Sequence, residues 1–210
     1  FSSGLICLLG ALAALGAAAI DMYLPSLPSI ESELGGVSGS AQFTLSSFFI
    51  GLGLGQLFYG PISDSLGRRK VLVVGLLIYC LGSLFCFFAG TMMELIAARF
   101  FQALGAAAGG VIARAMVRDV FSGKKAAQAQ SFINLAFSFT PLMAPLFGGY
   151  LLIFFGWRSI FIALLLFGII CLLILILKIP ETLPNEKRNT LRLVSIVLGY
   201  RTILRNSRSI

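Results

Sequence analysis

The chain has 210 residues, of which 58% are hydrophobic and only 11% are charged, and its formal net charge is +8. These charged side chains are too few to cover the surface of a soluble domain, so the composition indicates a membrane protein. The basic residues stand at the edges of apolar runs and not along one solvated face, which argues against nucleic acid as a partner. The sequence contains no histidine, which excludes histidine metal sites, serine–histidine triads and histidine proton relays.

Six apolar runs are long enough to cross a bilayer, and they cover residues 3–24, 41–62, 71–90, 95–116, 127–154 and 157–179. Each is predicted to be an α-helix, because a backbone exposed to lipid must satisfy its own hydrogen bonds. The first run has no basic region before it and carries Asp21 near its end, which favours a retained helix over a signal peptide. Because the chain begins at Phe1 without an initiator Met, we expect further residues upstream. The predicted fold class is an all-α membrane protein with six transmembrane helices.

Positive charge lies mainly on one side of the predicted helices. Thirteen of the sixteen Lys and Arg residues fall in or beside the segments 63–70, 117–126 and 180–210. The other side carries Glu31, Glu33 and Glu94, with Arg158 as its cation. By the positive-inside rule, both ends of the chain are predicted to face the cytoplasm, and Trp157 is predicted to anchor the outer interface.

Residues 180–210 differ in kind from the six apolar runs. Pro180 and Pro184 stop the sixth helix, and leucine and valine then recur at near-helical spacing among arginines. The spacing favours a basic helix lying on the membrane surface over a solvated tail. We therefore divide the chain into a membrane domain, 1–179, and a basic amphipathic cytoplasmic segment, 180–210.

The sequence offers few groups for catalysis or metal binding. The four cysteines lie inside apolar runs without metal-ligand spacing, so we interpret them as buried hydrophobic side chains. No carboxylate pair, histidine cluster or activated nucleophile supports an enzyme. We expect no metal and no cofactor, and any proton handling must use carboxylates.

Asp21 is the strongest single candidate for a functional residue. A carboxylate deep in an apolar helix is costly unless it faces the bundle interior, a cavity or a cation, and such residues commonly mark proton or substrate sites. Burial would favour the neutral carboxyl, which suits a group that carries protons. The alternative is that Asp21 is solvated at the outer interface, where Pro25 and Pro28 end the run.

Two arginines lie within the fourth run. Arg99 and Arg114 are fifteen residues apart, which places them on roughly the same helix face about four turns from each other. Arg99 is close enough to the outer end to snorkel to the interface. Arg114 is either a coupling residue or an ordinary cation at the inner edge of the membrane.

Other polar and helix-bending residues interrupt the apolar runs. Candidates to line an aqueous path, each also suited to an interhelical hydrogen bond, are Tyr23, Gln56, Gln102 and Asn134. The fifth run carries a set of residues that weaken the helix and allow a bend during gating or a static kink, namely Pro141, Pro145, Gly148 and Gly149. Glycines at 51, 53 and 55 follow no strand, so they favour close helix packing and not a nucleotide-binding loop.

A basic turn that contains two glycines, residues 60–70, separates the second and third runs. It contains Gly60, Asp64, Gly67, Arg68, Arg69 and Lys70, and it resembles the cytoplasmic signature of the major facilitator superfamily. In the same way, 99–105 is similar to that superfamily's second motif, and 144–149 resembles the motif of its antiporters. The segments 20–28, 116–119 and 180–184 look most like the Bcr/CflA drug-resistance transporters.

This resemblance implies the N-terminal half of a twelve-helix transporter, built as an inverted repeat of three plus three helices, whose partner is a second six-helix half. It implies proton-coupled export of small hydrophobic drugs across the bacterial inner membrane. It assigns Asp21 and Arg99 to proton or substrate coupling, and it places Asp64, Arg68 and Asp119 in a cytoplasmic latch. An uptake transporter of the same superfamily and a non-transporting membrane scaffold remain alternatives.

Overall fold

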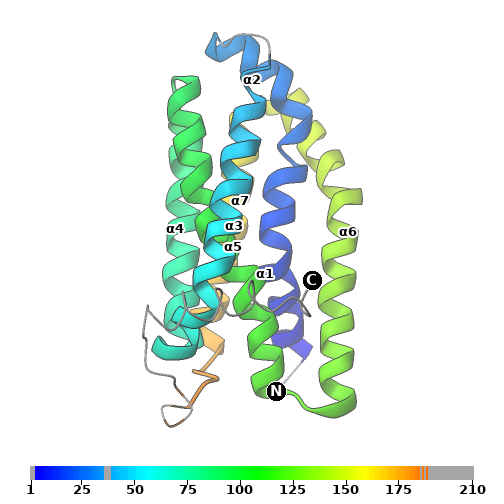
Figure 1. The fold of residues 1–210 in the computed structure, drawn as a ribbon. Coiled ribbons are helices and arrows are strands. Elements are labelled where there is room, and N and C mark those ends of the chain that lie inside the picture. Colours follow the sequence, from blue (N-terminus) through cyan, green and yellow to red (C-terminus); the bar gives the residue numbers. More distant parts are fainter. Residues whose placement is uncertain (1–2, 36–38, 185, 187, 189–210) are drawn as a thin grey trace, which may run out of the picture.

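A computed structural model describes residues 3–35, 39–184, 186 and 188, and these residues form helices joined by short turns. Figure 1 shows the helices in chain order: α1 (Ser3–Asp21), the short 3-10 helix η1 (Leu24–Ser26), α2 (Leu27–Leu34), α3 (Gln42–Leu66), α4 (Arg68–Phe88), α5 (Met92–Val120), α6 (Gly123–Phe155) and α7 (Arg158–Lys178). Within the described residues, six helical segments are long and apolar enough to cross a membrane, the first being the run from α1 through α2. The six predicted spans are therefore confirmed.

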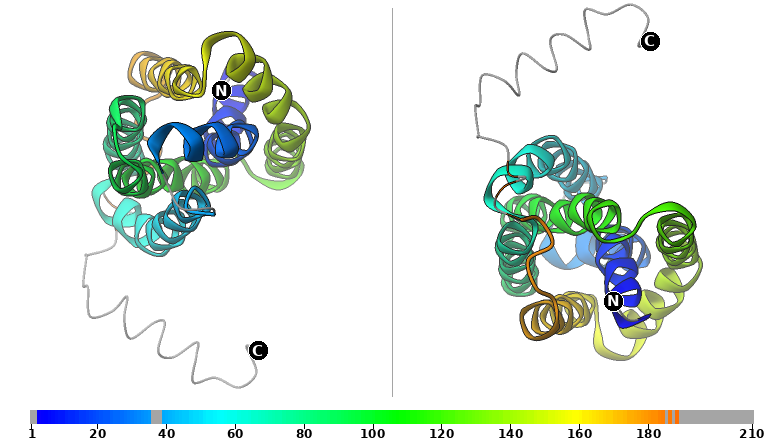
Figure 2. Two further views of the ribbon diagram at one scale, coloured as in Figure 1. Left: turned by 90° about the horizontal axis from the view of Figure 1, so that it is seen from above. Right: turned by 90° about the horizontal axis from the view of Figure 1, so that it is seen from below.

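The helices form one bundle around α5. This helix packs against α3, α4 and α1, while α1 also packs against α6 and α4 against α7, as the two end views show (Figure 2). If α1, α3 and α4 form one repeat and α5, α6 and α7 the other, exchanging the repeats converts the α3–α5 contact into the α6–α1 contact. The α1–α5 and α4–α7 contacts are converted into themselves. This contact pattern is that of an inverted three-plus-three repeat.

Glycine brings α3 and α5 into close contact; the sequence predicted close packing at these glycines but not the partner helix. A Cβ atom added at Gly51 would lie 2.5 Å from the carbonyl oxygen of Phe100, and one at Gly55 would lie 2.5 Å from the Cβ of Ala107. Gly53 has open space around its Cβ position. Two of the three glycines in this run therefore serve helix packing inside the chain, because only a residue without a side chain permits this approach.

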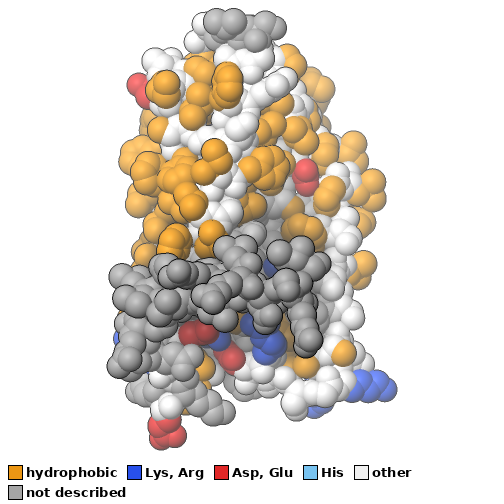
Figure 3. Space-filling view, viewed as in Figure 1, with side chains coloured by type: hydrophobic (Ala, Val, Ile, Leu, Met, Phe, Trp, Pro, Cys, Tyr) orange, Lys and Arg blue, Asp and Glu red, His pale blue; other side chains and the backbone are white. Residues whose placement is uncertain are grey.

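Charge is concentrated at one end of the bundle. The turn between α3 and α4 and the connection between α5 and α6 lie at this end, which we call the basic end, with Lys178 at the close of α7. The space-filling view shows hydrophobic side chains over the upper part of one face and charged ones gathered near the bottom (Figure 3). The surface therefore has the apolar band and charged edge that a bilayer requires.

Trp157 corrects one expectation about the opposite end. It is not an anchor exposed at an interface, because its side chain is buried and its Nε1 donates a hydrogen bond of 2.7 Å to Glu33 Oε2. The turn at Gly156, with φ of 78°, brings Trp157 beneath α2. Arg158 forms an ion pair with Glu33 and donates to the carbonyl oxygen of Ala89 at 3.2 Å. The cation of this end is therefore neutralised by a local carboxylate.

Two further expectations change in detail. Cys7 is exposed, whereas the other three cysteines are buried as predicted. Helix α3 continues past Pro61 to Leu66, and α4 begins at Arg68. The predicted connection 63–70 is therefore reduced to a single residue. Residues 180–184 follow α7 without forming a helix. Most of the predicted basic amphipathic helix, residues 185, 187 and 189–210, lies outside the described residues.

Candidate functional site

Residues from three predicted motifs meet where α1 ends. The chain turns at Asp21 into η1, whose first turn contains Pro25. From α5, Arg99 Nη1 donates a hydrogen bond of 3.0 Å to the carbonyl oxygen of Ala19. From α6, Gly148 lies so close to the backbone of Met22 that a Cβ atom at position 148 would overlap it. The end of α1 is thus held between a buried cation and a glycine.

Asp21 lies at some depth along the bundle and not at its outer end. Arg99 and Gly148, which contact Ala19 and Met22 on either side of Asp21 in the chain, are each seven residues from the end of their helices. Helix α5 begins at Met92 and α6 ends at Phe155, so seven residues correspond to about 10 Å. Asp21 is half-buried, and within the described part of the chain the structure shows no hydrogen bond or ion pair to its carboxylate. This depth favours a functional carboxylate over a residue solvated at the interface.

Arg99 is fully buried and does not snorkel to the membrane surface as the sequence suggested. Its guanidinium carbon lies 4.4 Å from the ring centre of Tyr23 and 4.1 Å from that of Phe48. Nη1 also donates to Gln102 Oε1 at 2.6 Å, while Nε and Nη2 have no hydrogen-bond partner. The aromatic rings stabilise the cation through their faces. Among the described residues, no carboxylate forms an ion pair or hydrogen bond with this buried cation.

The candidates for an aqueous path divide into two pairs. Tyr23 and Gln102 are fully buried, the first bonded through its hydroxyl to Thr44 at 2.7 Å and the second donating to Ser83 Oγ at 2.9 Å. They surround Arg99 and do not line a path, because neighbouring helices cover them on all sides. Gln56 and Asn134 are exposed on α3 and α6, where a lining role stays a prediction.

Arg114 is not brought to this site. Fifteen residues correspond to four turns plus about 60° of rotation, which is enough to bury Arg99 and to expose Arg114. Arg114 Nη1 donates to the carbonyl oxygen of Gly110 at 3.4 Å, within its own helix. The predicted shared face therefore does not hold, and a coupling role for Arg114 stays a prediction.

The helix α6 remains continuous through Pro141 and Pro145. Its upper part, which follows these prolines, leans toward α1 in Figure 1, as expected where proline removes a backbone donor. Gly148 makes the contact with Met22, whereas Gly149 has open space at its Cβ position. The two glycines of this motif thus face different surroundings, and bending during gating stays a prediction.

At the basic end, Arg68 joins α3, α4 and α5. Its Nε donates to Asp119 Oδ2 at 2.9 Å and its Nη1 to Ser63 Oγ at 2.7 Å, and it forms an ion pair with Asp64. The residue is 7% exposed. Asp64, Arg68 and Asp119, which the sequence predicted to form a cytoplasmic latch, are in contact with one another through Arg68, and the latch role stays a prediction. Removing Arg68 would leave the partly buried Asp119 without its cation, which is costly.

Glu181 is a residue of this end to which the sequence assigned no role. Its Oε1 accepts the backbone N–H of Arg68 at 2.9 Å, and its Oε2 accepts that of Arg69 at 3.3 Å. The carboxylate therefore caps the N-terminus of α4, where three successive cations oppose the helix dipole. Arg69 also donates to the carbonyl oxygen of Ile176 at 2.7 Å. The signal was a lone carboxylate directly after the sixth apolar run.

Comparison with known proteins explains this combination of features. The family model of the Major Facilitator Superfamily matches residues 6–208. The chain belongs to the major facilitator superfamily. It is 43% identical to the uncharacterized MFS-type transporter YdgK of Bacillus subtilis, covering 86% of this chain and 46% of that protein. It is 38% identical to a bicyclomycin resistance protein homolog of Haemophilus influenzae, covering 93% of this chain and 49% of the relative.

A solved superfamily structure has the same fold. The human organic anion transporter MFSD10 aligns with a TM-score of 0.72 at 23% identity, over 96% of this chain and 54% of the other. The chain spans about half the length of the curated relatives that it matches. It therefore corresponds to one six-helix half of the superfamily fold.

Gly67, in the signature turn of the superfamily, allows a direct test of the turn geometry. Its φ of 97° is unfavourable for any side chain, and a Cβ atom would lie 2.5 Å from Glu181 Oε2. We expect Gly67→Ala to destabilise the protein by about 1–3 kcal/mol. Thermal unfolding of the purified full-length protein in detergent measures this.

The control for that test is Gly60→Ala, because Gly60 is helical and has open space at its Cβ position. Alanine there should be neutral or stabilising by about 0.5–1 kcal/mol. Equal losses of stability in the two variants would show that neither the φ angle nor the Glu181 contact makes Gly67 special.

Proposed function

We propose that the chain is the N-terminal half of a proton-coupled transporter that exports small hydrophobic drugs across the bacterial inner membrane, with both ends in the cytoplasm. The observation that supports this most directly is Asp21, a half-buried carboxylate without a partner among the described residues, two residues after Ala19, whose carbonyl oxygen accepts a hydrogen bond from the buried Arg99. The name of the Haemophilus relative, a bicyclomycin resistance protein homolog, supports a drug as the substrate. On this proposal the protein moves solutes without transforming them, and the coupling ion is the proton.

The geometry at the end of α1 suggests how a proton would drive transport. An ionised carboxylate and a buried guanidinium attract each other strongly in apolar surroundings, whereas a protonated carboxyl lacks that attraction. Gain or loss of one proton on Asp21 would therefore change the force on Ala19 and Met22, which Arg99 and Gly148 contact. A change of a few kcal/mol is sufficient to shift two conformations of a transporter.

The second half of the transporter would pack against α3 and α6. These two helices are the least buried of the six candidate spans. They expose large apolar side chains such as Phe49, Leu57, Leu142 and Phe147. The Arg68 cluster lies at the basic end of α3, so on this proposal it would latch one conformation of the two halves.

Drug movement in inverted membrane vesicles tests the function. Vesicles from cells that express the full-length protein should accumulate radiolabelled chloramphenicol when their interior is acidified, and vesicles from cells with an empty vector should not. A protonophore should abolish this accumulation, because it removes the proton gradient.

Accumulation that survives the protonophore would contradict proton coupling. Drug movement out of the inverted vesicles under the same gradient would indicate an uptake transporter instead. If vesicles with and without the protein accumulate the same amounts of chloramphenicol and of bicyclomycin, the scaffold alternative is favoured.

A further inference from the structure

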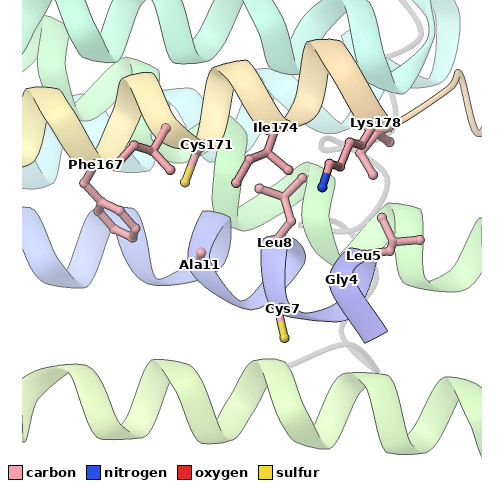
Figure 4. A pocket seen from close by; sticks show the side chains of 11 residues that line it. Gly4, Leu5, Cys7, Leu8, Ala11, Phe167, Cys171, Ile174 and Lys178 are labelled. Atoms are coloured by element: carbon pink, nitrogen blue, oxygen red, sulfur yellow. The ribbon is translucent and has the colours of Figure 1, made fainter. Parts of the chain in front are cut away.

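A pocket of about 610 Å³ lies between α1 and α7 in the half of the bundle nearest the basic end. Figure 4 shows Leu8 and Ala11 of α1 facing Phe167, Cys171 and Ile174 of α7 across it. Lys178 is its one charged lining residue among the described part of the chain. The pocket is therefore an apolar slot with a cation at one end.

The pocket exists because α1 and α7 lack the close contacts of the other neighbouring helices. A Cβ atom at Gly105 of α5 would overlap α4, and one at Gly109 of α5 would overlap α1. The glycine of α7, Gly168, faces Tyr79 of α4 and not α1. No glycine of the described residues joins α1 to α7, so their larger side chains hold the two helices apart.

The length of the pocket matches one leaflet of a bilayer. Along α7 it extends from Phe167 to Lys178, and the eleven helical rises between these residues correspond to about 16 Å. The hydrocarbon core of a membrane is about 30 Å thick, so each leaflet contributes about half of it. Its lining residues Gly4 and Ile170 are exposed, so a molecule in the surrounding membrane has access.

One end of the pocket carries a positive charge. Lys178 is the last residue of α7 and points toward α1 in Figure 4. Among the described residues, no carboxylate forms an ion pair with it. A cation at this depth suits the phosphate of an anionic lipid, whose acyl chain would extend along the apolar walls.

We propose that this pocket binds an anionic phospholipid of the cytoplasmic leaflet, with one acyl chain between α1 and α7 and the phosphate at Lys178. The lipid replaces side-chain packing that the two helices do not provide for each other. This site is separate from the proposed coupling site, because Arg99 contacts α1 near Asp21, whereas the pocket is lined by the first residues of α1.

Photochemical labelling tests the site directly. The full-length protein is placed in phosphatidylcholine vesicles that contain phosphatidylglycerol with a diazirine in one acyl chain, and labelled peptides are mapped by mass spectrometry. Label is expected in peptides of both α1 and α7. Ala11→Phe fills the slot and should eliminate that label, whereas Leu173→Phe, on the exposed side of α7 and outside the pocket, should retain it.

A second variant tests the role of the Lys178 charge and adds no bulk to the pocket. Phosphatidylglycerol and phosphatidylcholine, each carrying the diazirine, compete for the site, and Lys178→Gln should reduce the preference for phosphatidylglycerol about fivefold. Lys124→Gln, an exposed cation at the same end, should leave the preference unchanged. The proposal is overturned by label that persists in Ala11→Phe, by equal labelling from both lipids in the unaltered protein, or by cross-links showing that another segment of the chain fills the pocket.

Discussion

Asp21→Asn is expected to abolish proton-driven drug export by the full-length protein. Asparagine has nearly the same shape as aspartate but neither ionises nor carries a proton, so the attraction toward Arg99 no longer varies. The site beside Ala19 and Met22 should remain intact, because no hydrogen bond to the Asp21 carboxylate is lost within the described residues. Drug binding should therefore persist when transport has stopped.

The measurement combines drug accumulation in inverted vesicles with equilibrium binding of the same drug to purified protein. Glu186→Gln provides the matched control, because Glu186 is exposed and the substitution removes a carboxylate in the same way. Accumulation in Asp21→Asn that still follows the pH gradient would assign the proton to another residue. Loss of binding together with transport would make Asp21 a substrate ligand and not a proton carrier.

Arg99→Met is expected to remove transport while leaving the stability of the protein nearly unchanged. Burying a guanidinium without a counterion costs several kcal/mol. Its hydrogen bonds to Ala19 and Gln102 and its contacts with Tyr23 and Phe48 stabilise the folded protein by a similar free energy. Methionine fills a comparable volume without the charge, so the two effects should offset each other to within about 2 kcal/mol.

Thermal unfolding and drug accumulation, measured on the same preparation, separate these effects. Arg118→Met is the control on the same helix, because Arg118 is exposed at the basic end and contributes a few tenths of a kcal/mol through the helix dipole. If Arg99→Met unfolds at a much lower temperature and its transport falls only with the folded fraction, Arg99 is a structural residue.

Sequence patterns predicted the helices of this fold well. Twenty apolar residues in a row allow few structures in a lipid environment, so the spans follow from length and composition. The order of helix contacts does not follow in this way, since it depends on side chains that meet only in the folded bundle. The sequence predicts Gly51 and Gly55 to be packing residues, but it does not identify α5 as the helix that they contact.

The candidate site was predicted in part for the same reason. The cluster of Asp64, Arg68 and Asp119 was recognised because its residues occur in a familiar pattern. The burial of Arg99 was not, because it requires Phe48 and Tyr23 from two other helices to cover the guanidinium. Glu181 was missed because a helix cap donated by a distant segment has no local spacing to reveal it.

The capping of α4 by Glu181 can form only after the ribosome has synthesised the rest of the described helices. The carboxylate stands 113 positions after the first helical residue that it caps. At a translation rate of about 5–20 residues per second, it emerges roughly 6–23 s after that residue. During that interval the three cations at the start of α4 have no carboxylate from this segment. The insertion machinery therefore acts on these three cations, which influence the orientation of the helices, before Glu181 can cap α4.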